Sequence, residues 1–162
     1  MSIQEIWQLS YAADASVAMV FAAVNTTVNR LGLWPYSLVT FPGTLSHELL
    51  HYLAAKLFLA NPTLPDLWPR RNGNNWTMGS ITFEPSFMNR IPIALAPMLL
   101  LPGSLLVVVE LMHSATGWMY LFYAWVAGNM VHACWPSRQD WKVAAPALVI
   151  VVLLGICFWY FA

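Results

Sequence analysis

Charged residues are so scarce in this 162-residue chain that its apolar stretches run almost without interruption. Seven Lys and Arg together with seven Asp and Glu make up 9% of the residues, whereas 59% are hydrophobic. Soluble domains carry about 25% charged residues, because a dispersed domain must present polar groups to water. The formal net charge is zero. We therefore expect no nucleic-acid partner and no disordered chain, and the composition indicates a protein of the lipid bilayer.

Five hydrophobic segments are candidates for membrane-spanning helices, each of which needs about 20 residues. They cover approximately residues 9–28, 36–60, 91–112, 118–135 and 144–161. The first segment is the weakest because it contains Asp14, and four spans remain if it does not cross. Pro42 and Gly43 interrupt the second segment, so its regular helix is expected to begin there. The pattern predicts one all-α, polytopic membrane domain over residues 1–162 with about five transmembrane helices.

A long polar stretch, residues 61–90, separates the second and third segments. It opens with turn residues, and residues 76–83 then carry the β-branched and aromatic side chains typical of a short strand or β-hairpin. An exposed strand edge can bind an extended peptide through main-chain hydrogen bonds, so residues 78–83 are a candidate substrate-binding edge. The alternative is a hairpin at the membrane surface that does not touch a substrate.

Cations near the ends of the five segments predict the orientation of the chain. One side of the membrane would carry Arg70, Arg71, Arg90, Arg138 and Lys142, and the other side would carry Arg30 alone among the loops. Loops rich in Lys and Arg remain in the cytoplasm of membrane proteins. We therefore expect an integral, multi-pass protein whose long loop, residues 61–90, lies in the cytoplasm.

The second segment contains the motif His47-Glu48-Leu49-Leu50-His51. Two histidines four residues apart project from one face of a helix, so both imidazoles can bind one Zn²⁺, and Glu48 can act as the general base that takes a proton from the attacking water. Chance alone predicts about 0.002 such motifs in a chain of this composition. Ionisable residues inside an apolar segment are costly in a bilayer, which itself indicates a functional site. The alternative interpretation of these three residues is a polar interface that joins two helices by hydrogen bonds.

A catalytic zinc site needs three protein ligands and one open position. The remaining candidates for the third ligand are Glu110, His113, His132 and Asp140. We choose Asp140, because it opens the last segment on the side expected to be cytoplasmic and can reach back into the bundle. His132 is the alternative third ligand, and an ordinary carboxylate at a helix N-terminus is the alternative interpretation of Asp140.

The residues around this motif resemble a known family. Residues 41–45 (Phe-Pro-Gly-Thr-Leu) and 47–61, which begin with the motif, are similar to the first catalytic helix of the site-2 protease-like intramembrane zinc metalloproteases, in particular small bacterial and archaeal members. The resemblance implies a polytopic, prokaryotic cytoplasmic-membrane protease that uses zinc to cut the transmembrane segment of a membrane-protein substrate. Asp140 matches the family's aspartate ligand in its place along the chain. Leu50 and Leu59 stand where the family often has glycine, and no Asp is followed by Gly as in its second motif.

The expected function is therefore that of an intramembrane zinc metalloprotease, with the lipid bilayer and a transmembrane protein substrate as its partners. His47, His51 and Asp140 are the expected zinc ligands and Glu48 the expected catalytic residue. Asn129 is a candidate substrate-binding residue, because its amide can donate a hydrogen bond to a substrate carbonyl; an amide that packs between helices is the alternative. The competing function is that of a non-proteolytic zinc-binding membrane protein, either a pseudoprotease scaffold or a metal carrier.

Overall fold

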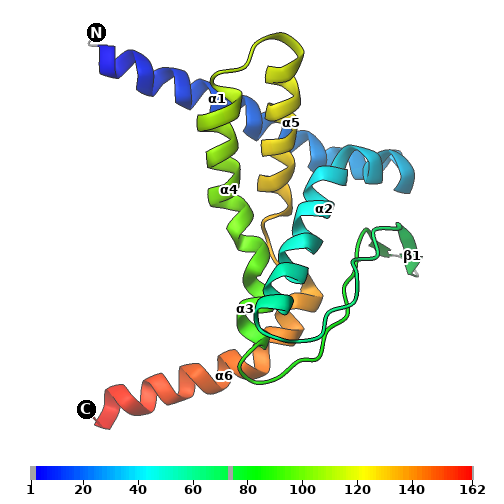
Figure 1. Cartoon of the computed structure of the whole chain (residues 1–162), viewed down its shortest axis with the longest axis vertical. Coiled ribbons are helices and arrows are strands. Elements are labelled where there is room, and N and C mark those ends of the chain that lie inside the picture. The colour runs from blue at the N-terminus through cyan, green and yellow to red at the C-terminus, as the bar shows by residue number, and fades with distance from the viewer. Residues whose placement is uncertain (1–2, 73–74, 162) are drawn as a thin grey trace.

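The computed structural model describes residues 3–72 and 75–161, which are mainly helical apart from the long stretch between the second and third α-helices (Figure 1). The helices and strands follow one another as α1 (Ile3–Val28), the 3₁₀ turn η1 (Asn29–Leu31), α2 (Leu33–Leu57), β1 (Arg70–Asn72), β2 (Asn75–Thr77), α3 (Arg90–Leu95), the 3₁₀ turn η2 (Ala96–Leu99), α4 (Leu100–Leu106), the π-helical segment η3 (Val107–Met112), α5 (Gly117–Ala133) and α6 (Arg138–Phe161).

Three helical segments in the described part of the chain are long and apolar enough to cross a membrane, which indicates a membrane protein. They are Ser10–Leu31, Arg90–Met112 and Arg138–Tyr160. This is fewer than the five predicted spans. Helix α5 has only 17 residues, which is short for a bilayer, and the polar residues of α2, including its two histidines and Glu48, lower its hydropathy. The first segment, the weakest by sequence, is among the three.

Helix α1 packs along α5 with very close backbone approach. A Cβ atom added to Gly128 would lie 2.5 Å from the carbonyl oxygen of Ala18 and 2.6 Å from Cβ of Phe21, so only glycine fits between these two helices. Ala18 is buried there with Ala124 in the main apolar cluster. Helices in lipid commonly associate through small residues that let their backbones approach closely. The hydrophobic effect contributes little there, because lipid tails are as apolar as the side chains themselves.

The third apolar segment is one continuous rod built from four pieces, α3, η2, α4 and η3. Pro97 and Pro102 explain its irregularity, because each proline lacks the N–H that would bond the carbonyl four residues earlier. Pro42 lies inside α2 without ending it, and α2 runs from Leu33 to Leu57. The prediction that this helix begins only at Pro42 was therefore wrong.

The strand expected over residues 76–83 is not formed. Strands β1 and β2 have three residues each and pair antiparallel, with Arg70 opposite Thr77, and β2 ends there. Farther along, Asp66 and Ser80 form an isolated bridge, and single backbone hydrogen bonds run from Thr63 to Thr82 and from Glu84 to Ala60. The segment opposite residues 78–83 contains Pro62 and Pro65, which cannot donate to a strand ladder, so pairing does not extend.

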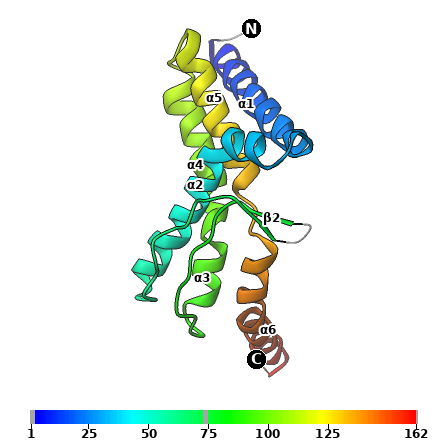
Figure 2. The same ribbon diagram turned by 90° about the vertical axis from the view of Figure 1, so that its right-hand side faces the viewer.

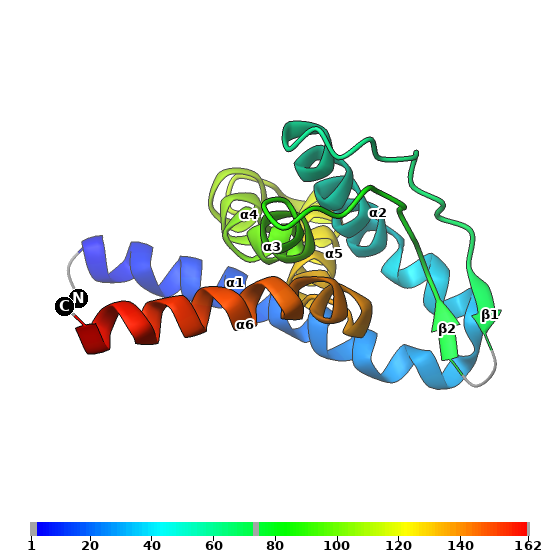
Figure 3. The same cartoon turned by 90° about the horizontal axis from the view of Figure 1, so that it is seen from below.

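The N-terminal half of α1 and the C-terminal part of α6 project from the central bundle toward the same side, at opposite ends of its long axis, and β1 and β2 lie on the other side (Figures 1, 2 and 3). The second half of α6 is exposed from Val149 to Tyr160 and is apolar along its whole length. Lipid is the solvent that such a surface requires, since a soluble protein rarely leaves so large an apolar patch in water.

Candidate metal centre

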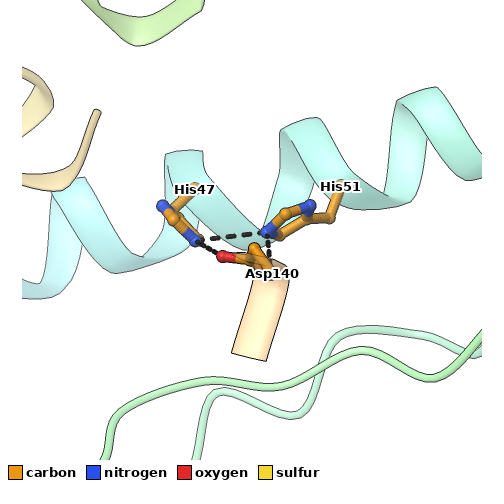
Figure 4. Close-up of side chains that lie close together, drawn as sticks. All are labelled: His47, His51 and Asp140. Carbon is orange, nitrogen blue, oxygen red and sulfur yellow. Dashed lines mark hydrogen bonds and ion pairs between the residues drawn. The ribbon is translucent and has the colours of Figure 1, made fainter. Parts of the chain in front are cut away.

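Two adjacent turns of α2 and the first turn of α6 bring three ligand atoms together. The Nε2 atoms of His47 and His51 are 3.2 Å apart. Oδ1 of Asp140 lies 3.2 Å from Nε2 of His51, and Oδ2 of Asp140 lies 3.6 Å from Nε2 of His47. The three side chains point toward one another from the two helices (Figure 4). All three ligand atoms lie within 4.8 Å of one another, so the group can hold a metal ion.

The ring of His51 is oriented by a backbone carbonyl that the proline pattern makes available. Its Nδ1 lies 2.8 Å from the carbonyl oxygen of Ile93. In an α-helix that oxygen would accept from the N–H of residue 97, but Pro97 has no N–H. The Ile93 carbonyl oxygen still accepts a 3₁₀-type hydrogen bond from the Ala96 N–H. The second lone pair of this oxygen is therefore available to the Nδ1–H of His51.

The ring of His47 is oriented in the same way by the end of α5. Its Nδ1 lies 2.7 Å from the carbonyl oxygen of Ala133, the last residue of that helix. The last four carbonyls of an α-helix have no partner within the helix, so this oxygen is open to a side-chain donor. Both histidines are thus held by carbonyls at places where the helical hydrogen-bond pattern is broken.

These two hydrogen bonds determine which ring nitrogen of each histidine carries the hydrogen. A carbonyl oxygen can only accept, so Nδ1 of each neutral histidine must carry the hydrogen, and each Nε2 presents a lone pair. Two lone pairs and the Asp140 carboxylate then face one another at 3.2–3.6 Å without a proton between them. Such a set of acceptors is stable around a cation, and histidine ligands of metals have this pattern of Nδ1–H donation to a carbonyl.

The Asp140 carboxylate is aimed by a reciprocal cap at the start of α6. The backbone N–H of Ser137 donates to Oδ2 of Asp140 at 2.6 Å, and the backbone N–H of Asp140 donates to Oγ of Ser137 at 3.2 Å. This is the capping-box arrangement, with Asp140 in the position usually taken by Glu or Gln. Ser137 was not among the predicted site residues, although the Ser-x-x-Asp spacing is the sequence signal for this cap.

Glu48 is buried beside the two histidines, with 8% of its surface exposed. The backbone of Gly79 in the long loop lies directly against its side chain. A Cβ atom added to Gly79 would be 2.7 Å from Cγ of Glu48 and 2.9 Å from its Oε1. Gly79 therefore allows the loop to cover the Glu48 carboxylate closely.

A cavity of about 880 Å³ contains the metal-ligating group and Glu48. Its walls come from α2, the loop after β2, the end of α5 and the start of α6. Arg138 and Lys142 contribute two exposed cations to the α6 side of this cavity. The cavity is large enough to admit a peptide segment beside the ligand atoms, since binding pockets for organic ligands span roughly 300–1,000 Å³.

The other sequence candidates lie elsewhere. His132 lines the cavity but is not in the ligand group, and its Nε2 contacts the Tyr36 hydroxyl. Asn129 is fully buried, donates to its own helix at the Trp125 carbonyl, and is absent from the residues that line the cavity. His113 contacts Asp14 at the other end of α5.

The two carbonyls that hold the histidines, those of Ile93 and Ala133, were not predicted from the sequence. A backbone oxygen carries no residue-type signal, and only Pro97 hinted at one of them. Comparison of the chain with protein-family models, curated proteins and solved structures finds no match.

Proposed function

We propose that this protein is an intramembrane zinc metalloprotease, which hydrolyses peptide bonds in or near transmembrane segments of membrane proteins. One observation supports the proposal above the others. Two histidine Nε2 lone pairs and one carboxylate converge beside a buried glutamate, in a cavity of a membrane protein. The resemblance of residues 41–61 to site-2 protease-like enzymes agrees with this chemistry.

His47, His51 and Asp140 would hold Zn²⁺, since two imidazoles and one carboxylate form a ligand set that catalytic zinc sites use. When bound, the metal polarises the substrate carbonyl and makes water more acidic. Glu48 takes a proton from the attacking water as its oxygen bonds to the carbonyl carbon. Glu48 then delivers that proton to the amine that leaves when the C–N bond breaks. The burial of Glu48 keeps its carboxylate in place for both transfers.

We propose five spans, with α2 and α5 crossing the membrane in addition to the three more apolar segments. Polar side chains of α2 and α5 that line the cavity then face protein and water instead of lipid, as intramembrane polar groups require. In this arrangement the long loop, residues 61–90, lies in the cytoplasm of a prokaryotic cell.

Glu48→Gln tests the catalytic part of the proposal. The variant keeps the size of the side chain but cannot take the proton, so zinc content should stay at the wild-type level while cleavage falls by roughly 10²–10⁴-fold. The measurement is mass spectrometry of transmembrane-segment peptides incubated with each purified, zinc-loaded protein in detergent. Cleavage by Glu48→Gln at the wild-type rate would overturn the assignment of the base.

The second candidate is a non-proteolytic zinc-binding protein, for which the ligand group of His47, His51 and Asp140 would suffice. A binding site has no need of a buried base next to its ligands, so the position of Glu48 argues against it. Crosslinking of Glu48→Gln in native membranes separates the two: a protease retains partner proteins that the wild type releases as shortened products. Partners that both proteins retain intact would indicate a scaffold.

A further inference from the structure

A second polar pair lies in the same cavity as the metal-ligating group. The hydroxyl of Tyr36 on α2 is 3.2 Å from Nε2 of His132 on α5, and the two rings meet nearly edge to face, at 82° with centroids 6.4 Å apart. Both residues are half-buried and both line the cavity. The Tyr36 hydroxyl and the His132 ring together offer hydrogen-bond donors and acceptors to a ligand bound in the cavity.

This pair is rigidly connected to the metal-ligating group. His132 directly precedes Ala133, whose carbonyl holds the ring of His47. Tyr36 lies on the same helix as His47, three turns earlier, and Thr40 and Thr44 line the cavity at one-turn intervals between them. Polar side chains therefore follow one face of α2 from Tyr36 to Glu48.

The spacing matches an extended peptide. Eleven residues of α-helix separate Tyr36 from His47, about 16 Å at the usual rise. An extended chain advances about 3.3 Å per residue, so about five residues cover that length. The path is shorter on the His132 side, because His132 directly precedes Ala133, whose carbonyl contacts His47. A peptide whose scissile bond lies beside Glu48 thus brings a group three to five residues away to the Tyr36–His132 pair.

We propose that Tyr36 and His132 form a distant substrate subsite, which hydrogen-bonds a backbone amide or carbonyl of the unwound substrate three to five residues from the cleaved bond. This inference rests on the proposed protease function. It assigns the pair a role in binding and selecting the extended segment, separate from the metal and from proton transfer.

Peptide hydroxamates of increasing length test the subsite. The hydroxamate chelates zinc and anchors one end, and Ala/Leu peptides of one to six residues extend from it in either chain direction. In one of the two series, the Kd for the zinc-loaded wild type should fall about fivefold when the chain reaches three to five residues, as one additional hydrogen bond predicts. Tyr36→Phe should abolish that step and leave the Kd of the short compounds unchanged.

Tyr123→Phe is the matched control, since Tyr123 is a partly buried tyrosine of the apolar cluster and does not line the cavity. It should preserve the step. A wild-type Kd that does not change with length in either series would overturn the subsite, as would a step that survives in Tyr36→Phe. A Tyr36→Phe variant that weakens all lengths equally would show a merely structural role. Failure of every hydroxamate to bind would instead overturn the metal site and with it the proposed function.

Discussion

At the scale of single residues, the chemistry depends on which atom of each histidine carries the proton. The four-residue spacing of His47 and His51 predicts two imidazoles on one face of a helix, and this prediction holds because a helix repeats every 3.6 residues. The sequence also led to Asp140, which the structure places beside them. It did not lead to the carbonyls of Ile93 and Ala133, because any residue can supply a backbone acceptor.

Gly79 is the residue whose replacement should affect Glu48 most selectively. In Gly79→Ala the new methyl group would overlap Cγ and Oε1 of Glu48, so either the loop or the carboxylate must move. We expect cleavage to fall by roughly 10–100-fold, since small displacements of catalytic groups have costs of this size. Zinc content should remain that of the wild type, which peptide-cleavage assays and metal analysis of the same sample would establish.

Gly155→Ala is the control for this substitution, because a Cβ atom at Gly155 would meet no atom within 4 Å. It should cleave at the wild-type rate. Equal rates for wild type and Gly79→Ala would show that the loop does not hold the carboxylate.

At the scale of helices, proline determines how the third apolar segment contributes to the site. Because Pro97 has no N–H, the Ile93 carbonyl lacks its α-helical donor, and the Nδ1–H of His51 donates to this oxygen instead. In Pro97→Ala the restored N–H would compete for this oxygen and free the ring of His51. We expect zinc affinity to fall about tenfold, the lower end of the range for loss of a group that orients a ligand. Competition with a fluorescent chelator measures the change.

Pro102→Ala provides the comparison, since Pro102 is exposed in α4 and lies outside the cavity lining. Its zinc affinity should match that of the wild type. If both proline variants bind zinc like the wild type, the Ile93 carbonyl is not needed to orient His51.

The effect of Pro42 on α2 could not be predicted from the sequence alone. Pro42 was expected to begin a helix, yet α2 continues through it, because neighbouring side chains and α5 support the irregular turn. The Trp125 indole N–H of α5, for example, donates to the Val39 carbonyl at 3.0 Å, one residue after the Leu38 carbonyl that Pro42 leaves without its helical donor. A proline by itself does not say which of these outcomes tertiary packing will favour.

At the scale of the whole molecule, composition predicted a membrane protein and the structure agrees, with three segments of sufficient length and apolarity. The number of spans could not be read from hydrophobic segments alone. Helix α2 carries the polar groups of the site, and α5 ends at Ala133, where its last carbonyl holds His47. The features that make these two helices functional are the same ones that weaken their signal as spans.

Zinc K-edge X-ray absorption on the purified protein tests the central claim, which is that α2 and α6 jointly form a metal centre. We expect one zinc per chain with nitrogen and oxygen ligands and no sulfur, and a clear loss of zinc in Asp140→Ala. The two cysteines, Cys134 and Cys157, are free and offer the competing ligands. A sulfur ligand in the wild-type spectrum, or undiminished zinc with an unchanged spectrum in Asp140→Ala, would contradict it.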